Sequence, residues 1–360
     1  MNDLKYLWIG LCLVCLLGNA RASCYINKGD LSSNYLFFSI ENGVYDILHS
    51  DNVATNHAVY LLCGDSRQPI QLVCQANGLF KSQFPNVQCS KVFKTTVEMV
   101  LDPSCHYEMF RVGYKYQNHF MEVYRSCYDS LRYAAQFSVN KVYPSRNSAT
   151  RQPSSFTTDG AMTGSDAFAY FYSRIYQRFE NVLGPRQNYV KNRLPNLFDH
   201  GHLTPNGDYS FDQLQKSTNK LRNVVPQYSN VNIGNWKNIE AWVKRLLVNR
   251  NYDVLKVCTG ALGVHELQAK SGMMTPMYLL DNNRIPIPKW MYKIVSHISG
   301  QQWVVLTYND GLTRTQPNPS SFCNIVRCDP DLNLRGVGFS ICCRPFDFIQ
   351  KNVPHLTGVC

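Results

Sequence analysis

The chain has 360 residues, of which 44% are hydrophobic, and its formal net charge is +11. This length can bury one large core or two moderate ones, so hydrophobic burial is sufficient to fold it. After the first 22 residues, no apolar stretch is long enough to cross a bilayer. The positive charge favours polyanionic partners, and a basic surface that only confers solubility is the alternative interpretation.

The first 22 residues predict a signal peptide. Lys5 precedes an apolar run over 6–18, and Ala20-Arg21-Ala22 follows with the small-x-small pattern of a signal-peptidase site. A transmembrane anchor is the alternative, but the apolar run is too short to span a bilayer. We therefore expect cleavage after Ala22 and a secreted, extracellular protein that has no membrane contact after cleavage.

Cysteine usage supports an oxidising compartment. The chain has 14 cysteines, and removal of Cys12 and Cys15 with the signal peptide leaves an even twelve, which predicts disulfides. A zinc site is the competing interpretation, but paired Cys-x-x-Cys motifs with histidine partners are lacking. The pairing cannot be deduced from spacing. The twelve form two groups: Cys24, Cys63, Cys74, Cys89, Cys105 and Cys127, then Cys258, Cys323, Cys328, Cys342, Cys343 and Cys360.

Short β-prone runs, broken by Gly, Asn, Asp and Pro, fill the first part of the mature chain. Runs at 35–38 and 58–62 predict a disulfide-tied β-rich accessory module over residues 23–104, with a support or spacer role. Strand-like runs continue at 95–101 and 110–116. We expect a second domain over residues 105–360 that ends in a cysteine-rich tail.

The second domain alternates helical and strand patterns. A Ser, Thr, Pro, Gly and Asn-rich segment at 142–164 is either a loop over a site or a mobile connection. Apolar spacing then predicts one helix over 165–183 and another from near 232 to about 247. Strands are expected at 254–259 and, entered through prolines, at 285–295. Composition and periodicity thus indicate mixed α and β structure.

The segment 199–240 concentrates histidines and carboxamides within a basic stretch. His202 is a candidate general base, because a neutral imidazole near its ordinary pKa can take a proton from water. The Asn232 amide oxygen is a candidate ligand for Mg²⁺, which uses few protein ligands and keeps several waters. Glu240 follows eight residues later, so helical geometry turns both side chains toward one side.

Each of these features has a structural alternative. A histidine without a catalytic task is commoner than a general base, and asparagines often cap helices and turns. His200 and His202 could form a metal pair, but alternation along a strand would place them on opposite faces. The combination of motifs is more specific than its members.

The ordered motifs resemble the DNA/RNA non-specific endonucleases of the His-Me finger (ββα-metal) type. Asp199-His200-Gly201-His202 resembles the Asp-Arg-Gly-His signature of that family. The Asn-x-x-x-Asn-x-x-Pro-Gln block follows at 219–227, and Asn-x-Gly-x-Trp-x-x-x-Glu at 232–240. Thr259-Gly260-Ala261-Leu262 and the strand at 287–295 extend the similarity over roughly residues 105–350. The two cysteine-rich parts resemble the secreted arthropod branch of double-stranded RNases and salivary nucleases.

The resemblance implies an α+β fold with a mainly antiparallel sheet. It also implies a Mg²⁺-dependent (or Mn²⁺-dependent) endonuclease with one ion per site, which hydrolyses DNA and RNA, double-stranded forms included, and leaves 5′-phosphate ends. Its implied roles are general base for His202, metal ligand for Asn232, and support of the metal's water shell for Glu240. Asn223 and Gln227 would support the site.

Basic residues are expected to hold the nucleic acid. By the same resemblance, Arg151 matches the upstream phosphate-binding arginine, with Arg146 as the alternative. From Arg186 to Lys256 there are 11 Lys or Arg against five acidic residues. The predicted nucleic-acid contacts within this stretch are Arg193, Lys216, Lys220, Arg222, Gln227 and Lys237.

His200 departs from the family signature, in which an arginine occupies this position. An arginine makes two fixed hydrogen bonds to phosphate, whereas histidine is largely neutral at pH 7. Loss of that charge could lower the rate by orders of magnitude while binding persists. The alternative functions are therefore a catalytically weak nucleic-acid-binding protein of the same fold, and a disulfide-rich extracellular interaction protein.

Overall fold

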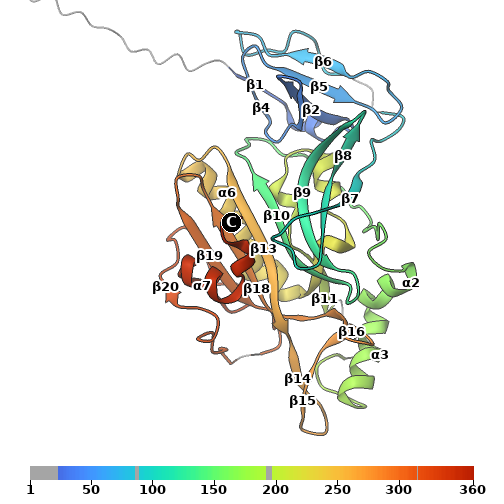
Figure 1. Ribbon diagram of the computed structural model, residues 1–360, viewed down its shortest axis with the longest axis vertical. Helices are drawn as coiled ribbons and strands as arrows, with labels where there is room; N and C mark the ends of the chain where they lie inside the picture. The colour runs from blue at the N-terminus through green and yellow to red at the C-terminus, as the bar shows by residue number, and fades with distance from the viewer. Residues whose placement is uncertain (1–22, 86–88, 192–196, 314) are drawn as a thin grey trace, which may run out of the picture.

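The computed structural model describes residues 23–85, 89–191, 197–313 and 315–360. The predicted signal peptide, residues 1–22, lies outside these residues. Two parts are visible in Figure 1: an N-terminal β-rich module and a larger body built on one long sheet. Within the described residues, no helix combines the length and hydropathy that a membrane crossing requires.

The larger body is organised around a nine-stranded sheet in which every neighbouring pair of strands is antiparallel. This confirms the predicted α+β class with a mainly antiparallel sheet. In spatial order its strands are β20 (Ile325–Val326), β21 (Ser340–Cys343), β19 (Gln302–Tyr308), β18 (Pro288–Ser296), β13 (Leu255–Val264), β10 (Ala134–Val142), β9 (His119–Asp129), β8 (Glu108–Tyr116) and β7 (Thr96–Val100).

The N-terminal module contains a short helix and two small antiparallel sheets. Its helix is α1 (Lys28–Leu31). One sheet pairs β1 (Ser23–Tyr25) with β4 (Asn52–Ala54), and the other has the order β3 (Val44–Ile47), β2 (Leu36–Glu41), β5 (Ala58–Leu62), β6 (Ile70–Val73). Its core continues into the β8–β9 hairpin, where Tyr114 and Tyr124 are buried with it. The module is therefore packed onto the edge of the main sheet. Although residues 96–100 fall in the predicted accessory segment, β7 itself belongs to the main sheet.

Helices and small hairpins complete the larger body. The helices and helical turns are α2 (Gly164–Ala167), η1 (Phe168–Tyr170), α3 (Tyr172–Leu183), η2 (Asn206–Asp208), α4 (Asp212–Ser217), η3 (Leu221–Asn223), α5 (Ser229–Val231), η4 (Asn232–Trp236), α6 (Lys237–Asn249), α7 (Pro345–Asn352) and η5 (Pro354–Leu356). The two-stranded sheets are β11 (Phe198–His202) with β12 (Val224–Tyr228), β14 (Glu266–Gln268) with β15 (Met274–Pro276), and β16 (Tyr278–Leu280) with β17 (Arg284–Pro286).

Alternation along the central strands gives the main sheet two covered faces. On β13, Val257 belongs to the core that contains α3 and α6, whereas Cys258 belongs to the core that contains α7. Successive side chains of a strand point to opposite faces, so one strand contributes to both cores. The larger of these cores also includes Val224 and Val225 of β12. The β11–β12 hairpin therefore packs onto this larger core.

The predicted strands are confirmed, whereas both predicted helices are interrupted. The strand expectations at 35–38, 58–62, 95–101, 110–116, 254–259 and 285–295 correspond to β2, β5, β7, β8, β13 and the β17–β18 pair. The helix expected over 165–183 breaks at Phe171, whose ψ of 138° is extended. The helix expected over 232–247 breaks at Gly234, whose φ and ψ are −89° and −121°. Apolar spacing survives a kink, so periodicity alone could not reveal either break.

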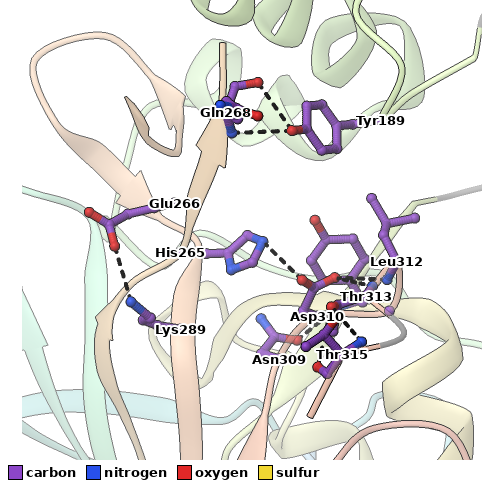
Figure 2. Close-up of polar contacts among 12 residues, drawn as sticks. Tyr189, His265, Glu266, Gln268, Lys289, Asn309, Asp310, Leu312, Thr313 and Thr315 are labelled. Carbon is purple, nitrogen blue, oxygen red and sulfur yellow. Dashed lines mark hydrogen bonds and ion pairs between the residues drawn. The ribbon is translucent and has the colours of Figure 1, made fainter. Parts of the chain in front are cut away.

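A buried asparagine fastens the β11–β12 hairpin to the main sheet. Asn309 accepts a hydrogen bond from the Tyr228 N–H (3.0 Å) and donates to the carbonyls of Pro226 and Pro288, both at 3.0 Å. Figure 2 shows Asn309 beside Asp310, whose carboxylate lies 3.8 Å from Nε2 of the buried His265. One amide thus joins β12 to β18 without a continuous ladder.

The cysteine-rich tail holds the kink at Gly234. Val337 accepts a hydrogen bond from the Asn235 N–H (2.8 Å), and the Asn235 side chain accepts from the Gly336 N–H (2.7 Å) and donates to the Gly338 carbonyl. A Cβ on Gly234 would lie 2.9 Å from the backbone nitrogen of Val337 and closer still to its carbonyl oxygen. Glycine is needed here because of close backbone approach.

Six disulfides join all twelve cysteines of residues 23–360, and each stays within its predicted group. The pairs are Cys24–Cys74, Cys63–Cys89, Cys105–Cys127, Cys258–Cys360, Cys323–Cys343 and Cys328–Cys342. The last two close the segment that carries Val337. Their cross-links reduce the freedom of the tail that touches Gly234.

We expect Gly234→Ala to lower the free energy of unfolding by about 1–3 kcal/mol, because the added methyl group overpacks the contact with Val337. Guanidinium-induced unfolding under non-reducing conditions measures this. Gly164→Ala is the matched control, since a Cβ there has no neighbour within 4 Å. An equal stability for Gly234→Ala and wild type would show that the tail does not constrain the kink.

Candidate active site

The β11–β12 hairpin carries the signature segment to the wall of a cavity of about 870 Å³. In the hairpin register, Asp199 pairs with Gln227 and Gly201 pairs with Val225. A Cβ on Gly201 would lie 2.5 Å from Cβ of Gln227, so the glycine permits the close strand contact. The cavity is lined by Arg151, Phe156, Tyr170, Phe171, Tyr172, Phe198, Asp199, His200, His202, Pro205, Asn206, Asn232, Ile233, Lys237 and Glu240.

His202 has a defined hydrogen-bond partner. Its Nε2 lies 2.9 Å from Oδ1 of Asn219, and the Asn219 amide group donates to the carbonyl and hydroxyl oxygens of Ser154. Since a carbonyl oxygen only accepts, the amide NH₂ must face Ser154 and Oδ1 must face the imidazole. Nε2 therefore carries the proton, and Nδ1 keeps a lone pair. Burial lowers the pKa of His202 to about 4, although the Asn219 hydrogen bond opposes that shift.

Asn232 is oriented by Asp199. Its Nδ2 donates to Asp199 Oδ2 (2.8 Å), and the other carboxylate oxygen of Asp199 accepts from the Ser229 hydroxyl (2.8 Å). This arrangement commits the Asn232 NH₂ group, so its amide oxygen is the atom available as a metal ligand. The kink at Gly234 follows two residues later. Asn232 thus lies on a short turn that contacts Asp199 of β11 and, through the kink, the backbone of Val337.

Glu240 extends from α6 into the same cavity and belongs to a charged cluster behind it. Burial raises the pKa of Glu240 to about 7; Lys293 opposes this shift and Asp208 reinforces it. The buried Lys293 donates to the Thr259 hydroxyl (2.6 Å), and Asp208 accepts from the Asn140 amide (2.9 Å). One cation therefore lies among two carboxylates, which limits the cost of burying each charge.

His200 lies in a stack of aromatic rings. Its ring centroid is 4.3 Å from that of Phe156 and 4.1 Å from that of Tyr170, with interplanar angles of 18° and 20°. Burial lowers the pKa of His200 to about 4, so the ring is neutral at pH 7. The position that holds an arginine in the family signature therefore contributes a flat, uncharged wall.

Among the residues that the structure describes, two exposed basic side chains line the cavity, Arg151 and Lys237. The Arg151 charge also acts on His202 and Glu240, whose pKa values it lowers. Arg146, the alternative to Arg151, instead lies over the Tyr25 ring at 4.0 Å in the N-terminal module. Of the two arginines, only Arg151 lines the cavity.

Asn223 and Gln227 do not line the cavity. Asn223 is fully buried; it accepts from the Thr204 N–H (2.9 Å) and donates to the carbonyls of Thr204 and Thr218. It ties the loop after β11 to the segment before η3. Gln227 is also fully buried beneath Gly201, which corrects its expected contact with nucleic acid, because a buried amide cannot reach an external ligand.

Three of the expected nucleic-acid contacts have partners within the protein and lie away from the cavity. Lys216 pairs with Asp212 (2.6 Å), and the buried Lys220 pairs with Asp159 (3.0 Å). The Arg222 guanidinium lies 4.2 Å above the Phe110 ring. None of the three lines the cavity, although the Lys216 side chain remains 36% exposed. Arg193 lies outside the described residues.

Asn219, Asp199 and Phe171 were not assigned roles from the sequence, yet Asp199 and Phe171 line the cavity and Asn219 contacts His202. Asp199 and Asn219 both belong to the motifs of the family, so their motif positions could have identified them as site residues. Phe171 had no such signal, because its side chain fits a helical apolar stripe equally well. Its exposure depends on the break between η1 and α3.

Comparison with known proteins locates the family over the same region. The model of the DNA/RNA non-specific endonuclease family matches residues 105–347. A salivary endonuclease of Lutzomyia longipalpis is 26% identical over 302 residues, which cover 80% of this chain and 71% of that protein.

More distant similarity is local. The mitochondrial endonuclease G of Homo sapiens is 28% identical over 113 residues, and the match covers 31% of this chain and 37% of that protein. A chain in the crystal structure of the EndoG/EndoGI complex aligns with a TM-score of 0.38 and 18% identity, covering 54% of this chain and 75% of that one.

The family match includes every ordered motif from Asp199 to Glu240 and all strands of the main sheet except β7. The predicted family resemblance is therefore confirmed, and with it a phosphodiester-hydrolysing chemistry on nucleic acid. The chain belongs to the DNA/RNA non-specific endonuclease family.

Proposed function

We propose that this protein is a secreted, Mg²⁺-dependent endonuclease that cleaves both DNA and RNA and leaves 5′-phosphate ends. The observation that carries the proposal is the pairing of His202 with Asn219 in the cavity that Asn232 and Glu240 also line. Hydrolysis requires an activated water, neutralisation of phosphate charge and stabilisation of a leaving oxygen. The cavity offers a candidate group for each requirement.

His202 is the proposed general base. With Nε2–H donated to Asn219, the Nδ1 lone pair accepts a proton from water as its oxygen bonds to phosphorus. The phosphorus–O3′ bond then breaks; the 5′-phosphate stays on one fragment, and the departing 3′-oxygen takes a proton from solvent. Asn219 acts as a positioning residue, because it selects the tautomer that exposes Nδ1.

The donor set at Asn232 fits a hard divalent cation. Its amide oxygen remains available because Asp199 accepts from the amide nitrogen, and Mg²⁺ commonly binds to few protein oxygens and several waters. Within the described ranges, no group of three or more His, Cys, Asp or Glu is placed to hold a metal, so a closed zinc-type site is not supported there. Bound Mg²⁺ would supply positive charge for the leaving oxygen. Glu240, in the first turn of α6, would accept hydrogen bonds from surrounding water.

Arg151 and Lys237 are the proposed phosphate contacts. Both are exposed and line the cavity with His202. Since phosphate contacts carry no base information, this arrangement fits cleavage without sequence preference. It also fits both sugars, because phosphates are common to DNA and RNA.

Secretion is supported by the cysteine chemistry. All twelve cysteines of residues 23–360 form disulfides, which persist in oxidising compartments. The relative in Lutzomyia longipalpis is named for saliva. Residues 1–22 have the composition of a cleaved signal. N-terminal sequencing of protein recovered from the medium of expressing cells tests cleavage after Ala22.

Purified protein mixed with plasmid DNA or double-stranded RNA should fragment both with Mg²⁺ and neither with EDTA. His202→Ala should lower the cleavage rate by at least about 10²-fold, since the general base is lost, with little change in affinity. Gel electrophoresis measures cleavage, and a gel shift in EDTA measures binding. His57→Ala in the N-terminal module is the control. Intact substrate with a persistent gel shift would identify a binding protein, and unchanged cleavage by His202→Ala would reject His202 as base.

His200→Arg should raise kcat, because a guanidinium between the Phe156 and Tyr170 rings would add a fixed positive charge to the cavity wall. A gain of about tenfold or more is expected from one added charged donor near the phosphate. Single-turnover cleavage of a short duplex measures it. A rate equal to or below that of wild type would show that neutral His200 does not limit turnover.

Asn219→Asp should move the acid limb of kcat/KM to higher pH. In the wild type, the base is neutral above its pKa of about 4, so activity should fall as the pH decreases toward that value. A carboxylate beside Nε2 stabilises the imidazolium, raises the pKa of His202, and thus removes the neutral base at a higher pH. Cleavage rates from pH 4 to 8 at one fixed Mg²⁺ concentration measure the shift. Superimposable acid limbs would contradict the assigned contact.

A further inference from the structure

The cavity carries exposed aromatic surface that the proposed chemistry does not use. Phe168 and Phe171 are 48% and 57% exposed, with ring centroids 5.0 Å apart. The break at Phe171 separates η1 from α3, so neither helix continues across this point. Figure 1 shows α2 and α3 on the flank of the larger body, away from the N-terminal module.

Phe171 differs from the other aromatic residues of the cavity. The rings of Phe156 and Tyr170 already stack against His200, whereas in the part of the chain that the structure describes Phe171 has ring contact with Phe168 alone. Phe171 and the 70% exposed Ile233 both line the cavity. A flat apolar face is thus available beside the polar groups.

The occupant of this face should be part of the substrate. Exposed apolar patches usually mark contact with a partner, but Phe171 shares its cavity with His202, Arg151 and Lys237. A phosphate bound by those groups belongs to a nucleotide whose base would lie close to Phe171. A base inside a duplex has its faces covered by neighbouring pairs, whereas an unpaired base can turn outward and stack on an aromatic ring.

We propose that Phe171, supported by Phe168, is a stacking subsite for an unpaired nucleobase next to the scissile phosphate. This inference rests on the proposed nuclease function and names a substrate class for it: strands with bulges, loops or single-stranded segments. Every base has a stacking face, so the subsite selects unpaired structure without selecting sequence. Phe171 would hold the backbone in position while His202 and Asn219 act on the water.

Three short DNA duplexes test the subsite by direct binding in EDTA, where no cleavage occurs. One is fully paired, the second has a single unpaired 2-aminopurine bulge, and the third has an abasic bulge that keeps the backbone distortion without the base. Anisotropy of a terminal dye gives Kd, and 2-aminopurine emission reports stacking. Stacking is worth about 1–3 kcal/mol per base, so the wild type should bind the base bulge about 5- to 150-fold more tightly than the abasic bulge.

The variants separate stacking from general apolar contact. Phe171→Leu should abolish the preference between the two bulges and the quenching of 2-aminopurine, while affinity for the paired duplex is unchanged. Phe171→Trp should retain both. Phe346→Leu is the matched control, because Phe346 is 71% exposed on α7 and is not among the cavity-lining residues. Equal wild-type affinity for the two bulges, or a preference that survives Phe171→Leu, would overturn the proposal.

Cleavage with Mg²⁺ distinguishes this proposal from the nuclease function. A wild type that prefers the base bulge in EDTA but leaves all three duplexes intact retains the subsite and fails as an enzyme. A wild type that cleaves all three duplexes and binds both bulges equally retains the enzyme and loses the subsite. Absence of binding to every duplex rejects both.

Discussion

Buried carboxamides hold the β11–β12 hairpin in place. The β11–β12 hairpin shares no ladder with the nine-stranded sheet, so the polar backbone of β12 needs other partners. Asn309 supplies them by joining Tyr228, Pro226 and Pro288 through three hydrogen bonds. Asn223 does the same for the loop that follows His202. Because an amide both donates and accepts, one side chain can link two backbone segments with no net charge to bury.

The same property orients the two working amides at the cavity. Asn219 commits its NH₂ group to Ser154, and Asn232 commits its NH₂ group to Asp199. Each therefore turns its oxygen in a defined direction, one toward Nε2 of His202 and the other toward the cavity. An aspartate at either position would bring a charge and lose the donor. Neutral amides thus set the tautomer of His202 and leave the Asn232 oxygen facing the cavity, and neither adds a negative charge that would repel a phosphate.

Local pattern predicted most of this fold, while side-chain contacts between distant segments remained unreadable. Alternation and turn residues located strands such as β5 and β8, and motif order located His202, Asn232 and Glu240. The break at Gly234 could not be predicted, because it depends on Val337, about a hundred residues away. Lys220 and Arg222 were assigned to nucleic acid from charge alone. Their partners, Asp159 and Phe110, lie in other elements, and burial follows from those contacts rather than from residue type.

The ring stack gives a structural reason for histidine at position 200, where the family signature has arginine. His200 lies between Phe156 and Tyr170, so its imidazole is held by packing as much as by chemistry. Where the family signature has a guanidinium cation, this chain has a neutral imidazole that packs between two aromatic rings. Within the described ranges, positive charge at the cavity then comes from the exposed side chains of Arg151 and Lys237.

The contact between the tail and Gly234 links the shape of the cavity to disulfide formation. Segment 328–342, which two disulfides close, supplies the backbone partners of Asn235, three residues from the proposed metal ligand. In a reducing compartment that segment would lack its covalent ties, and the turn at Asn232 would lose a neighbour that holds its shape. Formation of the native turn at Asn232 would then follow oxidation of these cysteines, so disulfide formation and the shape of the cavity are coupled.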